Sequence, residues 1–69
     1  MPVARKEAPK RYLVKFLDPE GRPRAAAFSY NQREAVRLAE NSLASFRVAL
    51  AKAGDPLADV EYRMEIKEV

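Results

Sequence analysis

Hydrophobic positions in this chain follow two different periods. Between Asn31 and Gly54, apolar side chains recur every three or four residues, which places them along one stripe of an α-helix. The stripe comprises Val36, Ala39, Leu43, Phe46, Leu50 and Ala53. Asn31 can accept a backbone hydrogen bond at the helix start, and Glu34 stands where its side chain can reach back to Asn31. Gly54 and Pro56 favour a helix end. The pattern predicts one long helix over residues 31–54.

Three other segments alternate apolar and polar residues with a period of two, which is typical of strands with one buried face. They cover residues 11–17, 25–30 and 59–67. Residues 18–21, with the sequence Asp-Pro-Glu-Gly, fit a type I turn because Asp favours the first position, Pro the second and Gly the last. The first two strands should therefore form a hairpin.

These elements predict an α+β fold in the order strand, strand, helix, strand (ββαβ). A right-handed return after the helix places the third strand antiparallel beside the first, which gives a three-stranded antiparallel sheet of order 2-1-3. The helix should pack on one face of this sheet. We expect that face to carry Tyr12, Phe16, Phe28, Tyr30, Tyr62, Met64 and Ile66. A helix of about 33 Å should extend past strands of about 23 Å by a turn or two.

Five of the residues expected beneath the helix are aromatic, which allows two interpretations. Exposed aromatic rings on a sheet can stack on the bases of a single strand. The same sheet face, however, must receive the helix, which favours a role in the core.

The chain divides into two parts. Residues 1–10 combine proline with basic residues and show no apolar period, so we expect a flexible basic arm. Residues 11–69 should form a single ββαβ domain with a thin core, because a chain of 69 residues buries little apolar surface.

The composition excludes several kinds of chemistry. The chain has no Cys and no His, which removes thiol and imidazole catalysis, disulfides and nearly all zinc sites. Its carboxylates fall in turns or on solvent-facing positions, and its two glycines match no phosphate-binding loop. We therefore expect a protein that is not an enzyme and holds no cofactor or metal.

The chain lacks the features of a membrane or exported protein. No stretch approaches the roughly 18 consecutive apolar residues of a membrane span, and the amino terminus lacks the apolar core of a signal peptide. We expect a soluble cytoplasmic protein without membrane contact. Its richness in Arg, Glu, Ala and Pro suggests thermostability.

Positive charge is concentrated toward the amino terminus. The formal net charge is +3, and residues 1–24 carry seven basic and three acidic side chains, whereas residues 55–69 carry two and five. Basic surfaces attract polyanions because phosphate binding releases condensed counterions. We expect a small accessory protein that binds DNA or RNA through phosphate contacts from the arm and the hairpin tip. The candidate residues are Arg5, Lys6, Lys10, Arg22 and Arg24, which lack the acidic partners expected across the sheet, in Glu61 and Glu65, for Arg11 and Lys15.

A protein-binding adapter or inhibitor of the phage or mobile-element type is the alternative function. It would act through the helix surface or a strand edge, as a homodimer. The possible interface residues are Leu13 and Leu17 on the outer sheet face, and Ala44, Val48 and Ala51 on the back of the helix. Ala25 and Ala27 should add to the apolar area of the outer sheet face. Apolar strips of this kind on a small domain favour self-association or docking of a partner.

Overall fold

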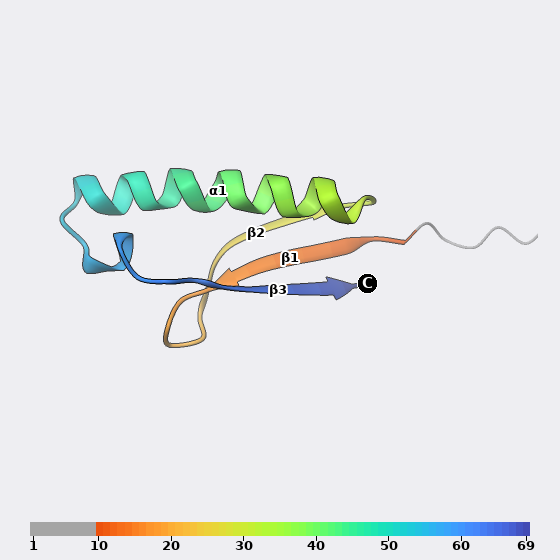
Figure 1. Cartoon of the computed structure of the whole chain (residues 1–69), viewed down its shortest axis with the longest axis horizontal. Coiled ribbons are helices and arrows are strands. Elements are labelled where there is room, and N and C mark those ends of the chain that lie inside the picture. The colour runs from red at the N-terminus through yellow and green to blue at the C-terminus, as the bar shows by residue number, and fades with distance from the viewer. Residues whose placement is uncertain (1–9) are drawn as a thin grey trace, which may run out of the picture.

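The computed structural model describes residues 10–69. The elements are the strands β1 (Tyr12–Leu17) and β2 (Pro23–Ser29), the helix α1 (Gln32–Lys52), the short 3-10 helix η1 (Pro56–Ala58) and the strand β3 (Arg63–Glu68). β1 pairs antiparallel with both other strands, which gives the sheet order β2-β1-β3, and α1 lies along one face (Figure 1). The predicted ββαβ fold and strand order are confirmed. The predicted arm, apart from Lys10, lies outside the described residues.

The helix begins as the sequence predicts. The Asn31 side chain accepts a hydrogen bond of 3.1 Å from the backbone N–H of Glu34. The Glu34 side chain does not return to Asn31, because it forms an ion pair with Arg37 one turn further along. At the other end the helix stops at Lys52, and Gly54 follows with a φ of +71°, a left-handed conformation that favours glycine.

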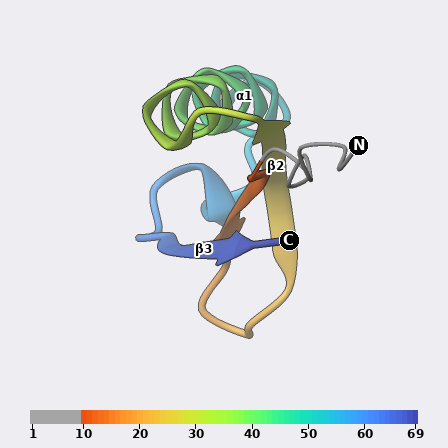
Figure 2. The same ribbon diagram turned by 90° about the vertical axis from the view of Figure 1, so that its right-hand side faces the viewer.

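The core lies between α1 and the strands β1 and β2. Val14 is completely buried, and so are Ala35 and Ala39 of the helix. The cluster also contains Phe16, Ala25 and Leu43. Figure 2 shows β2 reaching up toward α1 and β3 lying further from it, and the backbone of α1 does not approach β3 in the described chain. The helix therefore covers two strands of the three.

The register of β2 differs from the prediction. Ala25 pairs with Phe16 and Ala27 pairs with Val14, so these alanines face the helix, whereas Phe28 pairs with Leu13 on the opposite side. The predictions that Phe28 faces the helix and that Ala25 and Ala27 lie on the outer face were therefore wrong. A slip of one residue exchanges the two faces of a strand, and here a bulge between Phe16 and Leu17 shifts the pairing.

Tyr30 was also expected beneath the helix, and this was wrong as well. It follows the end of β2 and is 61% exposed. The predicted core positions Tyr12 and Tyr62 are correct, because both are half-buried and pack against the core cluster.

The third strand begins later than predicted. The sequence indicated residues 59–67, but β3 starts only at Arg63 because the preceding segment folds beneath the end of α1. There the Tyr62 hydroxyl donates a hydrogen bond of 2.7 Å to the carbonyl of Leu57, and the guanidinium of Arg47 lies 5.0 Å from the centre of the Tyr62 ring. This segment explains the predicted overhang, because it covers the part of α1 that extends past the sheet.

Candidate nucleic-acid interface

Asp18 organises the hairpin tip. Its Oδ1 accepts hydrogen bonds of 2.9 Å from the backbone N–H groups of Glu20 and Arg22, and its Oδ2 accepts one of 2.8 Å from Nε of Arg24. The N–H of Gly21 donates to the Asp18 carbonyl at 2.8 Å, which closes the predicted turn. The bond from Arg24, aided by the backbone bonds, lowers the pKa of Asp18 below its usual value, while Asp18 raises the pKa of Arg24.

The sequence suggested that the hairpin arginines have no acidic partners, and this was wrong. Arg24 is bound to Asp18 and its side chain is only 30% exposed, so its charge is used within the fold. Nε of Arg22 lies 3.7 Å from Oε1 of Glu20, and Nζ of Lys10 lies 3.7 Å from Oε2 of Glu68. Exposed pairs at this distance are weak, so Arg22 and Lys10 can still meet a polyanion.

The remaining two predicted contacts, Arg5 and Lys6, lie outside the described residues. For all five candidates, nucleic-acid binding stays a prediction.

A second group of cations lies on the sheet face opposite α1, called here the outer face. The strand register places Lys15 beside Glu65, Leu17 beside Arg63 and Leu13 beside Lys67. The guanidinium of Arg11, just before β1, lies 6.0 Å from the ring centre of Phe28 on the same face. In the described part of the chain, the charged residues of the outer face are Arg11, Lys15, Arg63 and Lys67, with one carboxylate, Glu65.

These four cations form no ion pair with a carboxylate among the described residues, although Lys15 lies opposite Glu65 in the strand register. None of their nitrogen atoms lies within 4.0 Å of a carboxylate oxygen there. Of the predicted pairing of Arg11 and Lys15 with Glu61 and Glu65, the register confirms only that Lys15 lies opposite Glu65, and these two side chains form no ion pair within 4.0 Å. Glu61 precedes β3 and so falls outside the strand register, while Arg11 lies over an aromatic ring.

Two exposed aromatic rings adjoin these cations. Phe28 is 47% exposed, and its ring centre lies 6.0 Å from that of Tyr30 at an interplanar angle of 70°. Exposed aromatic faces next to cations can stack on nucleic-acid bases. Sequence reasoning assigned both rings to the core. The signal that was missed is the alanines of β2, because small side chains there and on α1 let the helix and the strand pack closely.

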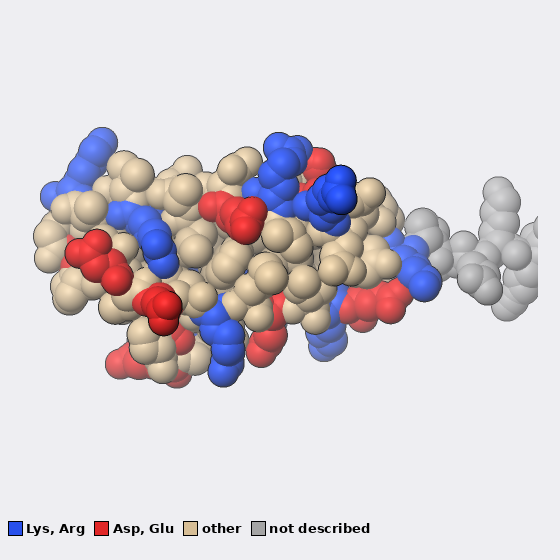
Figure 3. Space-filling view, in the orientation of Figure 1, with Lys and Arg blue, Asp and Glu red and all other residues tan. Residues whose placement is uncertain are grey.

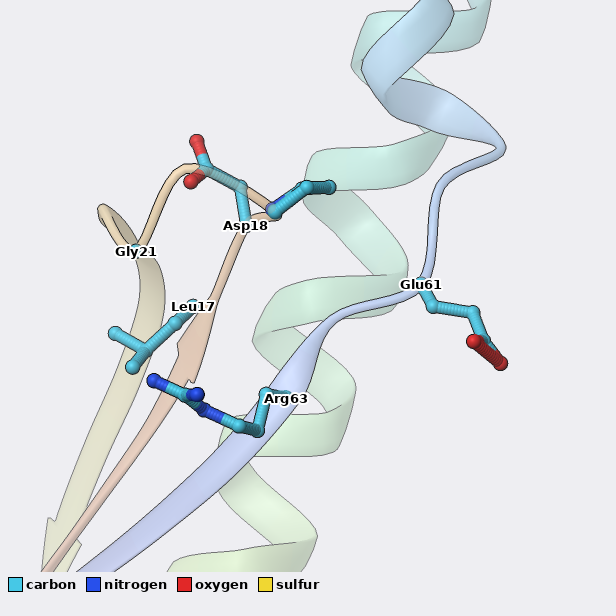
Figure 4. Close-up of a pocket in the computed structure, with 6 residues that line it drawn as sticks. Leu17, Asp18, Gly21, Glu61 and Arg63 are labelled. Atoms are coloured by element: carbon cyan, nitrogen blue, oxygen red, sulfur yellow. The ribbon is translucent and has the colours of Figure 1, made fainter.

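The hollow at the hairpin tip does not assemble a catalytic pair. It has a volume of about 350 Å³ and is lined by Leu17, Asp18, Pro19, Gly21, Glu61 and Arg63. Figure 4 shows the carboxylates of Asp18 and Glu61 pointing in different directions, and Asp18 is already hydrogen-bonded to Arg24. These two carboxylates therefore cannot share a substrate as acid and base.

Within residues 10–69, no group of three or more ligand-type side chains could hold a metal ion. No helix there is long and apolar enough to cross a membrane.

The predicted interface residues are scattered. Leu17 is buried beneath the hairpin tip, so the expectation that it is exposed was wrong, and Leu13 is half-buried on the outer face. Ala44, Val48 and Ala51 are exposed on α1. Whether these residues contact a partner stays a prediction.

Comparison with protein families, with curated proteins and with solved structures found no match. Function is therefore inferred from the chemistry of the residues alone.

Proposed function

We propose that this chain binds single-stranded nucleic acid across the outer face of its sheet. The main support is the combination of four cations that form no ion pair with a carboxylate in the described chain and the adjacent rings of Phe28 and Tyr30. The arm residues Arg5 and Lys6 add phosphate contacts in this proposal. The hairpin tip contributes less than the sequence suggested, because Arg24 is bound to Asp18.

Each part of this surface has a separate role. Lys and Arg bind phosphates and release counterions, which makes the affinity dependent on salt. Aromatic rings stack on unpaired bases and contribute about 1–3 kcal/mol per base with little preference for sequence. An exposed sheet face with aromatic rings suits bases that are splayed out, as in single strands, more than the grooves of a duplex. We expect weak preference for sequence, because phosphate contacts carry no sequence information.

A protein-binding adapter remains the second candidate. The observation that favours it is the exposure of Met64 and Ile66 on β3, which α1 leaves uncovered. An exposed strand edge with apolar side chains can receive a strand from a partner.

The test is a titration of the full chain with a labelled single-stranded oligonucleotide, followed by fluorescence anisotropy at several salt concentrations. With about six phosphate contacts, four from the outer face and two from Arg5 and Lys6, log K should fall against log salt with a slope near −4. Lys15→Gln combined with Arg63→Gln should reduce the size of this slope by about 1.4. Phe28→Ala should weaken binding by about 5- to 150-fold and leave the slope unchanged.

The matched control is Arg33→Gln combined with Lys52→Gln, which removes the same charge from exposed positions on α1. This variant should bind nearly as well as the wild type. An equal loss in both double variants would show attraction by net charge alone and would contradict the proposed surface. Absence of binding at about 50 mM salt would contradict nucleic-acid binding itself.

A further inference from the structure

Among residues 10–69, no strand pairs with the outer edge of β3, which is therefore open. β2 and β3 are the two edges of the sheet, and all six residues of β3 are exposed. Met64 and Ile66 point to the helix side of the sheet, where α1 does not reach, and are 44% and 39% exposed. An open edge with apolar side chains is a ready template for pairing with another strand.

The direction of the backbone groups on this edge follows from one hydrogen bond. The N–H of Val69 donates to the carbonyl of Arg11 at 2.8 Å. Hydrogen-bonded pairs alternate along an antiparallel ladder, so the odd-numbered residues of β3 direct their backbone groups toward β1. Met64, Ile66 and Glu68 therefore direct theirs toward the open edge, where a further strand can bind.

We propose that two copies of this chain pair antiparallel through β3, with Ile66 opposite Ile66 of the second copy. The two sheets then join into one of six strands. In this register Glu65 lies opposite Lys67 of the second copy, and the twofold axis repeats the contact. Met64 lies opposite Glu68, whose carboxylate is 3.7 Å from Lys10 and has its charge partly balanced.

The charges on β3 favour this register over the one in which Glu65 lies opposite Glu65 of the second copy. A shift that places Glu65 opposite itself would also place Arg63 opposite Lys67, and like charges directly opposite are destabilising. An odd shift would put the apolar side of one copy on the polar side of the other. Figure 3 shows positive and negative side chains alternating along the lower margin of the molecule, where β3 lies in this view.

Pairing in this way also neutralises the single carboxylate of each outer face. Glu65 is then occupied by Lys67, and Arg11, Lys15 and Arg63 of both copies lie on one side of a continuous sheet. The dimer does not depend on nucleic-acid binding, because its contacts are among its own strands. One six-residue edge makes a small interface, so we expect a dissociation constant in the micromolar range.

Sedimentation velocity at concentrations from about 1 to about 500 μM gives the first measurement, with a transition from one to two chain masses expected. Two single variants then test the register. Glu65→Lys gives a chain with cations at both positions 65 and 67, and Lys67→Glu gives a chain with anions at both. Each variant alone should be monomeric, because both interchain contacts become repulsive.

An equimolar mixture of the two variants should form a heterodimer, because every contact between positions 65 and 67 is again between opposite charges. Circular dichroism of each variant confirms that it is folded before mixing. A wild type that stays monomeric up to about 500 μM would overturn the proposal. A mixture that fails to associate, variants that dimerise alone, or wild-type assemblies larger than two chains would do the same.

Discussion

Asp18 shows how much a single side chain contributes to the hairpin tip. An aspartate at position 18 predicted the turn, because Asp favours the first position of type I turns. Its bond to Arg24 could not be predicted, because the two residues are six apart and their approach depends on the bulge after Phe16. The same bond removes Arg24 from the expected nucleic-acid surface.

The lowered pKa of Asp18 predicts a dependence of stability on acid. Because the folded chain holds this carboxyl below its usual pKa of 3.8, the ionised group stabilises the fold above that pH. The stabilisation should be lost as the pH falls through the lower folded value. Asp18→Asn should therefore reduce the free energy of unfolding at pH 7 and reduce its further loss at low pH, measured by urea denaturation at both pH values.

Arg24→Gln provides the matched comparison, because it removes the same hydrogen bond from the other side. It should flatten the dependence on acid only in part, because the backbone bonds from Glu20 and Arg22 to Asp18 remain, and the double variant should add little to Asp18→Asn. Retention of the full wild-type loss in both single variants would contradict this role for the pair.

Among the elements, the contact between α1 and β2 was the hardest to predict. The helix, its start at Asn31 and the strand order followed from the hydrophobic periods and turn chemistry. The facing of β2 did not, because Ala25 and Ala27 give a weak hydrophobic signal and Phe28 gives a strong one. The face of β2 that lies against α1 is decided by side-chain size, because small residues on both elements let the helix approach the strand closely.

Enlarging an alanine in this contact should therefore destabilise the fold. Ala39 is completely buried, and Ala39→Leu should lower the free energy of unfolding by about 1–3 kcal/mol through overpacking. Leu and Ala have similar helix propensity, so the change reports packing. Ala44→Leu on the exposed side of α1 is the control and should change stability by less than about 0.5 kcal/mol. Equal stability of the two variants would show that the helix does not rest on the alanines.

At the scale of the whole molecule, one helix covers two of three strands, and this leaves two surfaces without a partner in the described chain. One is the open edge of β3, and the other is the outer face with its cations and aromatic rings. The sequence predicted a basic protein with a spare apolar surface. The residues that make up each surface became evident only when the strand register was known, because a shift by one position exchanges the two sides of a strand.

The most direct test of the central proposal is an NMR titration of the ¹⁵N-labelled chain with an unlabelled single-stranded oligonucleotide. The account predicts that chemical-shift changes concentrate on the outer face, at Arg11, Lys15, Phe28 and Arg63, and that Arg33 and Lys52 on α1 stay nearly unchanged. Changes confined to α1, or no changes at all under low salt, would contradict binding by the outer face.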